Sequence, residues 1–400
     1  MATHPPYDVA DSPAAFEQVA ARLLRGRGPF ALDTERASAY RYDDRAFLIQ
    51  VHRRGSGTFL IAPEGHRDDV ERILAPVLNG QEWILHAAGE DLPSLAALGL
   101  YPGVLFDTEL ASRLAGFDRP NLAAMVEFFT GVTLAKGHGK EDWSAIPLPP
   151  SWRTYAAEDV LYLFALAEGL AEYLDATGKL EIAEQEFAHL VRSSSDWSRA
   201  ARRTWRESKG VSALTRPQEL QVARAVWTER DERARRSDTA PGSILPNRVL
   251  IAIARAQPTS SAAAASISGF PRKRRGAAEK WSAVVRRALD ESPSTWPARA
   301  PRTTGAPPKK MWEHKDPRAW AALIRARDAV HAAATHLNIQ PETVLAASVL
   351  RETVWAATRL PCAPDTHSIA LELAGHGARP WQVEITAPLI AAALRERATA

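Results

Sequence analysis

The stretch PFALDTERASAYRYDDRAFLIQVHRRGSGTFLIA, residues 29–62, contains three short apolar runs separated by polar residues. The runs cover 30–32, 46–52 and 58–62, and a turn-forming Gly-Ser-Gly at 55–57 separates the last two. Apolar and β-branched runs bounded by turn residues are typical of strands. We therefore predict three strands, of which the last two form a hairpin.

Helical and strand patterns alternate after this opening. Apolar spacing predicts helices over 68–78, 92–98, 108–115, 122–130 and 151–174, strands over 82–86 and 104–107, and a loop over 133–150. Strands that alternate with helices favour an α/β domain, which we place at residues 1–200.

The two halves of the chain carry charges of opposite sign. Residues 1–200 contain 18 Lys and Arg against 29 Asp and Glu, a formal net charge of −11, whereas the remaining residues have a net charge of +14. An acidic half joined to a basic half indicates two different tasks, and nucleic acid is the commonest polyanion that a basic domain binds. A solvated basic face without a partner is the alternative.

The second half is predicted to be helical. Residues 207–290 show helical spacing with short breaks at Pro, and residues 201–290 alone have a net charge of +11. Pro, Ala, Arg and Thr dominate 291–317, which predicts an exposed linker, and residues 318–400 are helical again. Two helical units of similar size suggest a duplicated module.

The composition excludes several classes of protein. With 46% hydrophobic and 24% charged residues among 400, the chain is neither wholly disordered, nor a collagen, nor a coiled-coil rod. No apolar run reaches the roughly 20 residues of a membrane span, and residues 1–11 lack the pattern of a secretory signal. The single cysteine, Cys362, allows no intrachain disulfide and no cysteine-based zinc site, so we expect an inert thiol in a cytoplasmic protein without membrane contact.

Four carboxylates occupy positions that suggest a metal site. Asp33 and Glu35 lie two residues apart at the end of a predicted strand, so both side chains leave one face. Asp91 opens a helix after a strand, and Asp159 shares a helix face with Tyr155. Buried carboxylates need a partner or a metal, and oxygen ligands suit Mg²⁺ or Mn²⁺. Two such ions can stabilise the attacking and leaving oxygens of a phosphodiester displacement.

Four segments of the chain, in this order, resemble the exonuclease motifs of the DEDD superfamily in its tyrosine-bearing form. They are Leu32-Asp33-Thr34-Glu35, His86-Ala87-Ala88-Gly89-Glu90-Asp91-Leu92, Phe106-Asp107-Thr108-Glu109 and Tyr155-Ala156-Ala157-Glu158-Asp159-Val160. The similarity covers about residues 8–190 and is nearest to the ribonuclease D family. Residues 207–290 resemble the helicase-and-RNase-D C-terminal (HRDC) domain, and 318–395 look like a second, divergent copy. The resemblance implies an α/β exonuclease domain with a ribonuclease H-like mixed sheet and flanking helices, followed by two small all-α HRDC-like domains.

Carried over by position, the resemblance also implies a mechanism. Asp33, Glu35, Asp91 and Asp159 would ligate two divalent metal ions, Mg²⁺ or Mn²⁺, and Tyr155 would orient the attacking water, so that all five are catalytic. The implied reaction releases 5′-monophosphates from the 3′ end of RNA, in tRNA precursors and other small structured RNAs. The sequence does not fix the oligomeric state, and we expect a monomer.

Other residues are candidates for contacting the substrate. We expect Gln50 to contact the terminal nucleotide, His86 to pack or hydrogen-bond beside it, and His138, in a Gly-flanked loop, to touch it. Asp107 is predicted to hydrogen-bond behind the ligands or to cap the helix that begins at Thr108. In the basic unit, phosphate contacts are predicted for the run Arg272, Lys273, Arg274 and Arg275, with a solvated face as the alternative.

Two other functions are compatible with the sequence. One is an RNA-tethering protein whose exonuclease fold has lost activity, and the other is a 3′–5′ exonuclease of single-stranded DNA. All four carboxylates and the tyrosine are present, which favours an active enzyme. HRDC-like units without a polymerase or helicase region favour RNA.

Overall fold

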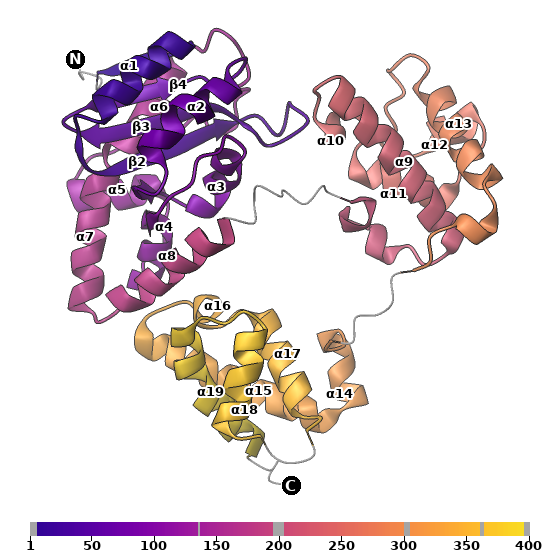
Figure 1. Cartoon of the computed structure of the whole chain (residues 1–400). Coiled ribbons are helices and arrows are strands. Elements are labelled where there is room, and N and C mark those ends of the chain that lie inside the picture. Colours follow the sequence, from indigo (N-terminus) through magenta and orange to yellow (C-terminus); the bar gives the residue numbers. More distant parts are fainter. Residues whose placement is uncertain (1–5, 135–136, 195–203, 300–304, 361–363, 396–400) are drawn as a thin grey trace.

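The computed structural model describes residues 6–134, 137–194, 204–299, 305–360 and 364–395 (Figure 1). They form a first domain of strands and helices (6–194), a helical second unit (204–299) and a helical third unit (305–395). The predicted fold class, an α/β domain followed by two small all-α units, is confirmed. Cys362 lies outside the described residues.

The described part of the first domain contains six strands and eight helices. The strands are β1 (Tyr7–Ala10), β2 (Arg27–Arg36), β3 (Ala46–Arg54), β4 (Gly57–Ile61), β5 (Glu82–Leu85) and β6 (Val104–Asp107). The helices are α1 (Pro13–Leu23), α2 (Arg67–Leu78), α3 (Ala88–Ala96), α4 (Thr108–Ala115), α5 (Leu122–Thr130), α6 (Pro150–Leu161), α7 (Leu163–Ala176) and α8 (Leu180–Ser194).

The six strands form one mixed sheet in the order β1-β4-β3-β2-β5-β6. The predicted hairpin is β3–β4, and β3 also pairs antiparallel with β2, whereas β5 lies parallel to β2 on its other side. The pairing register sets Asp33 opposite Gln50 and Glu35 opposite Leu48. Because side chains alternate along a strand, Asp33 and Glu35 share one face of the sheet. Helix α6 packs against β2, β3 and β4.

Three details differ from the sequence-based expectations. The strand β2 extends to Arg36, so both acidic residues lie inside it rather than at its end. The helix predicted over 151–174 is two helices, α6 and α7, which meet at Tyr162 (φ −97°, ψ −2°) without any Gly or Pro to signal the break. The edge strand β1, which pairs parallel with β4, has four residues, too few for a clear alternation.

The two helical units share one order of elements. The second unit contains α9 (Pro217–Arg236), α10 (Pro241–Ile244), α11 (Asn247–Ala256), α12 (Ser261–Ser266) and α13 (Ala277–Asp290). The third contains α14 (Trp312–Lys315), α15 (Pro317–Leu337), α16 (Pro341–Val344), α17 (Ala347–Ala357), α18 (Thr366–Gly375) and α19 (Pro380–Arg395). From α9 and from α15 onward, a helix of 20 or 21 residues precedes a one-turn helix that begins with Pro, and three more helices follow. This parallel supports the expected duplication.

The segment predicted as an exposed linker, 291–317, is partly packed. Trp312 is 0% exposed and its ring lies 4.7 Å from that of Trp355 in α17. The part of the segment after residue 305 therefore belongs to the third unit. None of the described helices is long and apolar enough to span a lipid bilayer.

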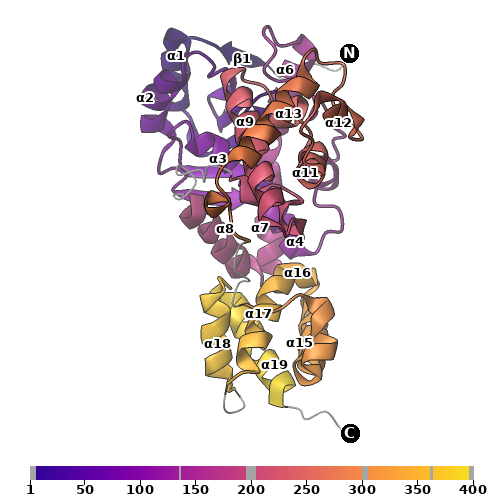
Figure 2. The ribbon, with the colours of Figure 1, turned by 90° about the vertical axis from the view of Figure 1, so that its right-hand side faces the viewer.

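Both helical units contact the first domain. The third unit lies next to α8 of the first domain (Figure 2). Glu186 in α8 accepts hydrogen bonds from Trp381 Nε1 at 2.7 Å and from Arg379 Nε at 2.6 Å, which join the two. The β2–β3 loop, residues 37–45, contacts the second unit: Arg45 pairs with Asp238 at 2.7 Å.

Candidate active site

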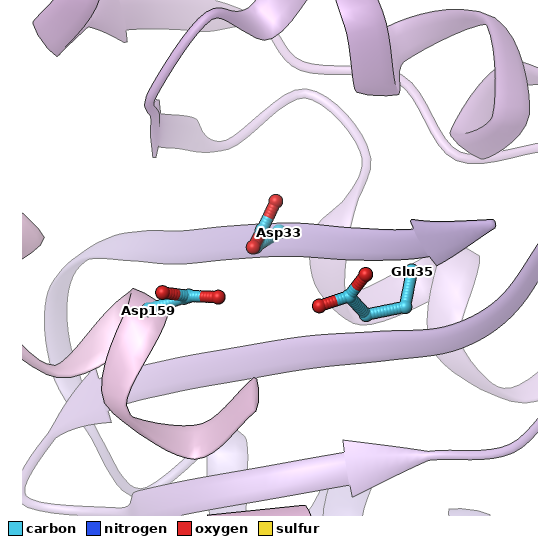
Figure 3. Close-up of side chains that lie close together, drawn as sticks. All are labelled: Asp33, Glu35 and Asp159. Carbon is cyan, nitrogen blue, oxygen red and sulfur yellow. The ribbon is translucent and has the colours of Figure 1, made fainter. Parts of the chain in front are cut away.

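Three carboxylates converge beside the central strand. Asp33 and Glu35 on β2 face Asp159 on α6, and one carboxylate oxygen of each lies within 4.8 Å of the others (Figure 3). The group lines a cavity of about 280 Å³ whose walls also include Asp91, Tyr155 and His86. Strand alternation puts the first two on one face, and the packing of α6 across that face brings in the third.

The fourth predicted ligand, Asp91, lies beside this group rather than within it. Its Oδ1 accepts a 2.6 Å hydrogen bond from Thr34 Oγ1, and Thr34 Oγ1 also lies 3.2 Å from Ser94 Oγ on α3. Thr34 stands between Asp33 and Glu35 on β2, so its side chain leaves the opposite face of the strand. The middle residue of the Asp-Thr-Glu motif therefore fixes the carboxylate that α3 contributes, a role that the sequence reasoning did not assign.

Burial and mutual repulsion disfavour ionisation of all these carboxyl groups. Burial, with the nearby charge of Asp159, raises the pKa of Asp33 to about 8. Burial and the neighbouring carboxylates raise the pKa of Glu35 to about 10, and burial raises that of Asp159 to about 7. The pKa of Asp91 is also raised, chiefly by burial and then by Asp33. Closely spaced, buried carboxylate oxygens of this kind fit a divalent cation, whose charge would offset both effects.

Tyr155 stands next to Asp159 on α6. Burial, and then the charge of Asp159, raises the pKa of the phenol, so the hydroxyl stays protonated at neutral pH. The backbone at Gly137 lies close to the Tyr155 ring, because a Cβ added at Gly137 would lie 2.8 Å from the Tyr155 hydroxyl. The His138 ring packs edge-on against Tyr155 with 5.6 Å between ring centroids.

Asp107 is a positioning residue for two helices. One of its oxygens accepts hydrogen bonds from the backbone N–H groups of Ala87, Glu109 and Leu110, and the other accepts from Ala88. Asp107 thus caps α4, as the sequence suggested, and also fixes the left-handed turn at Ala87 (φ 61°) where α3 begins. Burial raises its pKa to about 6.

Arg36 is a site residue that the sequence reasoning missed. It is the one Lys or Arg among the described residues that line the cavity. Its guanidinium pairs with Asp44 at 2.9 Å and lies 3.9 Å from Asp91. Its position directly after the Asp-Thr-Glu motif was the available signal.

Of the other residues predicted to contact the substrate, some line the cavity and others do not. His86 lines the cavity, and its Nδ1 lies 2.9 Å from Thr108 Oγ1. Burial lowers the pKa of His86 to about 4, so its ring is neutral. Gln50 is 0% exposed and does not line the cavity, and neither amide atom has a hydrogen-bond partner among the described residues. Gln50 is thus buried outside the cavity lining, and its contact with a nucleotide stays a prediction.

His138 packs on Tyr155 but does not itself line the cavity. The adjacent Gly139 lines the cavity instead. The basic run 272–275 belongs to the second unit and is not part of this site. Its members differ in their surroundings, because Arg274 and Arg275 line a separate cavity.

Comparison with family models assigns all three parts of the chain. Residues 7–175 match a model described as a 3′–5′ exonuclease, and residues 219–285 match the HRDC domain. Residues 305–394 match a model described as a 3′ to 5′ exonuclease C-terminal domain. The description of the third match thus differs from the second HRDC-like copy that we predicted.

Relatives with known names are similar to part of the chain. Ribonuclease D of Xanthomonas oryzae pv. oryzae is 32% identical over 244 residues, which are 57% of this chain and 62% of the relative. Ribonuclease D of Bartonella henselae is 28% identical, and the match covers 60% of that protein. The chain therefore spans about three fifths of the length of these relatives.

Solved structures match nearly the whole chain. A protein from Bifidobacterium adolescentis is 31% identical, with a TM-score of 0.82 over 98% of this chain and 100% of that chain. RNase D of Escherichia coli has a TM-score of 0.69 over 97% of this chain and 98% of that one, at 22% identity. The second likeness concerns the fold alone.

Proposed function

We propose, from the similarity to ribonuclease D and to the 3′–5′ exonuclease model, that this chain is a metal-dependent 3′–5′ exoribonuclease of the ribonuclease D family. The observation that carries the proposal is the convergence of Asp33, Glu35 and Asp159 to within 4.8 Å, in a cavity shared with Asp91 and Tyr155. The RNase D and HRDC similarities favour RNA over DNA as the polymer.

In the proposed reaction, Asp33, Glu35, Asp91 and Asp159 would hold two divalent ions, Mg²⁺ or Mn²⁺. When bound, these ions would lower the pKa of a water molecule and stabilise negative charge on the scissile phosphate. Thr34 and Arg36 keep the Asp91 carboxylate in place. The Tyr155 hydroxyl, protonated and beside Asp159, orients the attacking water by hydrogen bonding, and the neutral His86 ring borders the same cavity.

The substrates that we propose are tRNA precursors and other small structured RNAs, cut from the 3′ end to 5′-monophosphates. The Escherichia coli protein of this fold is described as an exoribonuclease involved in structured RNA processing. The second unit, in the segment with a net charge of +11, would supply the electrostatic attraction that the acidic first domain lacks. A monomer in the cytoplasm is the simplest form of the proposed enzyme.

The test is incubation of the pure protein with a 3′-extended tRNA and a DNA strand of the same sequence, each with Mg²⁺, Mn²⁺ or EDTA. We expect stepwise shortening of the RNA and release of 5′-monophosphates with metal, and none with EDTA. Faster shortening of the DNA would assign the enzyme to single-stranded DNA. No shortening of either strand would favour the RNA-tethering alternative.

The Asp33→Asn variant links the activity to the site. It removes one negative ligand and little volume, so turnover should fall by at least about 10³ while the fold is kept. A matched control is Asp68→Asn, which changes an exposed carboxylate on α2 remote from the cavity. Near-normal turnover of Asp33→Asn would contradict the ligand assignment.

A further inference from the structure

The second unit contains a cavity of its own. It has a volume of about 360 Å³, and four cationic side chains line it: Arg233, Arg274, Arg275 and Lys280. No Asp or Glu occurs among its lining residues within the described chain. Trp281, which is 2% exposed, contributes to its apolar floor together with Ile244 and Ala277.

The four cations differ in how far their charge is already neutralised. Arg233 donates to Glu229 at 2.6 Å, and its guanidinium lies 5.3 Å from the centre of the Trp281 ring. Arg274, Arg275 and Lys280 are exposed, and no ion pair joins any of them to a carboxylate of the described residues. Three positive charges around this concave surface are therefore available to an anion.

The cavity divides the basic run 272–275 into two pairs. Arg274 and Arg275 line it, whereas Arg272 and Lys273 do not. Arg272 Nε instead donates to the carbonyl oxygen of Ala265 at 2.6 Å, which holds this guanidinium against its own unit. Two pairs of equal charge, adjacent in sequence, thus have different surroundings.

The cavity borders the contact between the second unit and the first domain. Ser237 and Thr239 line it, and Asp238 between them pairs with Arg45 at 2.7 Å and with Arg41 at 3.3 Å. Both arginines lie on the β2–β3 loop, which continues from the strand that carries Asp33 and Glu35. An anion in the cavity would lie next to this junction, where the two arginines already neutralise Asp238.

We propose that this cavity is a subsite for the phosphodiester backbone of the RNA substrate, contacted by Arg274, Arg275 and Lys280. The proposal rests on the proposed function, since it assumes an RNA substrate. Arginine forks and a lysine ammonium are the donors that phosphate oxygens prefer. The aromatic side chain of the floor is buried, so the cavity offers charge to a phosphate rather than a stacking surface to a base.

The test compares two double variants that each remove two positive charges: Arg274→Ala with Arg275→Ala, and Arg272→Ala with Lys273→Ala. Binding of a 3′-extended tRNA is measured in EDTA, which prevents cleavage, over salt concentrations of about 50 to about 300 mM. The first variant should raise the Kd about tenfold and lower the salt slope by about two, because two phosphate contacts are lost. The second should raise the Kd less than about threefold. Melting curves of both variants check that the fold is kept.

Equal losses in the two variants would overturn the subsite and indicate diffuse attraction by the whole run. No loss in either would place the RNA contacts elsewhere. A free phosphate could meet the same side chains, so inorganic pyrophosphate is titrated as well. Tight pyrophosphate binding by the wild type, together with unchanged RNA affinity in the first variant, would assign the cavity to a small anion instead. Hydrolysis of a short single-stranded RNA by the wild type tests the proposed function separately, because it requires no variant of the second unit.

Discussion

At the level of single residues, the Tyr155 hydroxyl can be tested without disturbing its ring. Tyr155→Phe keeps the packing of the ring against Gly137 and His138. It removes only the hydroxyl, through which this side chain can hold a water molecule. We expect the single-turnover rate on a short RNA to fall about 10²-fold, the scale of one positioned catalytic group, with little change in RNA affinity. Tyr162→Phe, at the junction of α6 and α7, is the matched control. An unchanged rate in Tyr155→Phe would leave this tyrosine with a packing role alone.

The carboxylates make a prediction about pH. The pKa values of Asp33, Glu35 and Asp159 are raised in the folded protein to about 8, 10 and 7. At neutral pH the folded metal-free protein keeps protons on these carboxyl groups, whereas the unfolded chain has released them. This proton binding stabilises the folded state, and the stabilisation is lost as pH rises through the raised pKa values. A bound cation favours the ionised carboxylates, so Mg²⁺ should raise the Tm more at pH 9 than at pH 6.

The measurement is a set of melting curves in EDTA and in Mg²⁺ at both pH values. The difference between the two media cancels the pH dependence of groups remote from the site. In Asp33→Asn the rise in Tm caused by Mg²⁺ should be smaller at both pH values. A Mg²⁺ effect that shrinks between pH 6 and pH 9 would contradict the raised pKa values.

At the level of elements, the position of α3 depends on Asp107 at the end of β6. Asp107→Ala removes the cap of α4, at about 1 kcal/mol, and leaves the half-buried N–H of Ala87 and the buried N–H of Ala88 without an acceptor, at about 1–3 kcal/mol. The free energy of unfolding of the first domain should therefore fall by roughly 3 kcal/mol. Because α3 carries Asp91, the affinity for Mn²⁺, measured by calorimetry, should fall as well.

The control for this prediction is Asn121→Ala, which removes the cap of α5 in the same domain. It should cost about 1 kcal/mol and leave Mn²⁺ affinity unchanged. Equal stability losses in the two variants, with no change in Mn²⁺ affinity in either, would show that Asp107 acts only as a helix cap.

At the level of the whole molecule, the second unit is attached to the first domain through the β2–β3 loop. Asp238→Asn removes the charge that Arg41 and Arg45 contact, while the hydrogen bond from Ala240 N to the Tyr40 carbonyl is kept. The ion pairs of Asp238 with Arg41 and Arg45 are partly exposed, so we expect the contact between the units to weaken by about 1 kcal/mol. Hydrogen exchange in residues 37–45 should become roughly fivefold faster, with the core of α9 unaffected.

Tyr42→Phe is the matched control at the same contact. It removes only the hydrogen bond from the Tyr42 hydroxyl to Asp231, at 3.0 Å, and no charge pair. Exchange in the loop should change less than in Asp238→Asn, and the difference should shrink at high salt because charge pairs are screened. Unchanged exchange in Asp238→Asn would show that other contacts hold the second unit in place.

Local patterns in the sequence were enough for most of the fold. The turn at 55–57 and the apolar runs beside it predicted the β3–β4 hairpin, and α4 and α5 begin and end where the spacing placed them. Capping and turn residues are local signals, read from a few neighbours in the chain. The α6–α7 break at Tyr162 has no such signal, because the packing of α6 on the sheet and of α7 on α4 and α5 decides it.

The site, like the fold, depends partly on local sequence patterns and partly on tertiary packing. Motif spacing is a property of the chain, so the candidate carboxylates and the candidate tyrosine follow from the order of residues alone. The folded chain shows further that Asp33, Glu35 and Asp159 meet while Thr34 holds Asp91 beside them. It also shows that Gln50 is buried and that Arg36 lines the cavity. It likewise separated Arg274 and Arg275 from their neighbours in one basic run. Burial, repulsion between charges and ion pairing depend on distances between segments far apart in the chain, and no local pattern contains those distances.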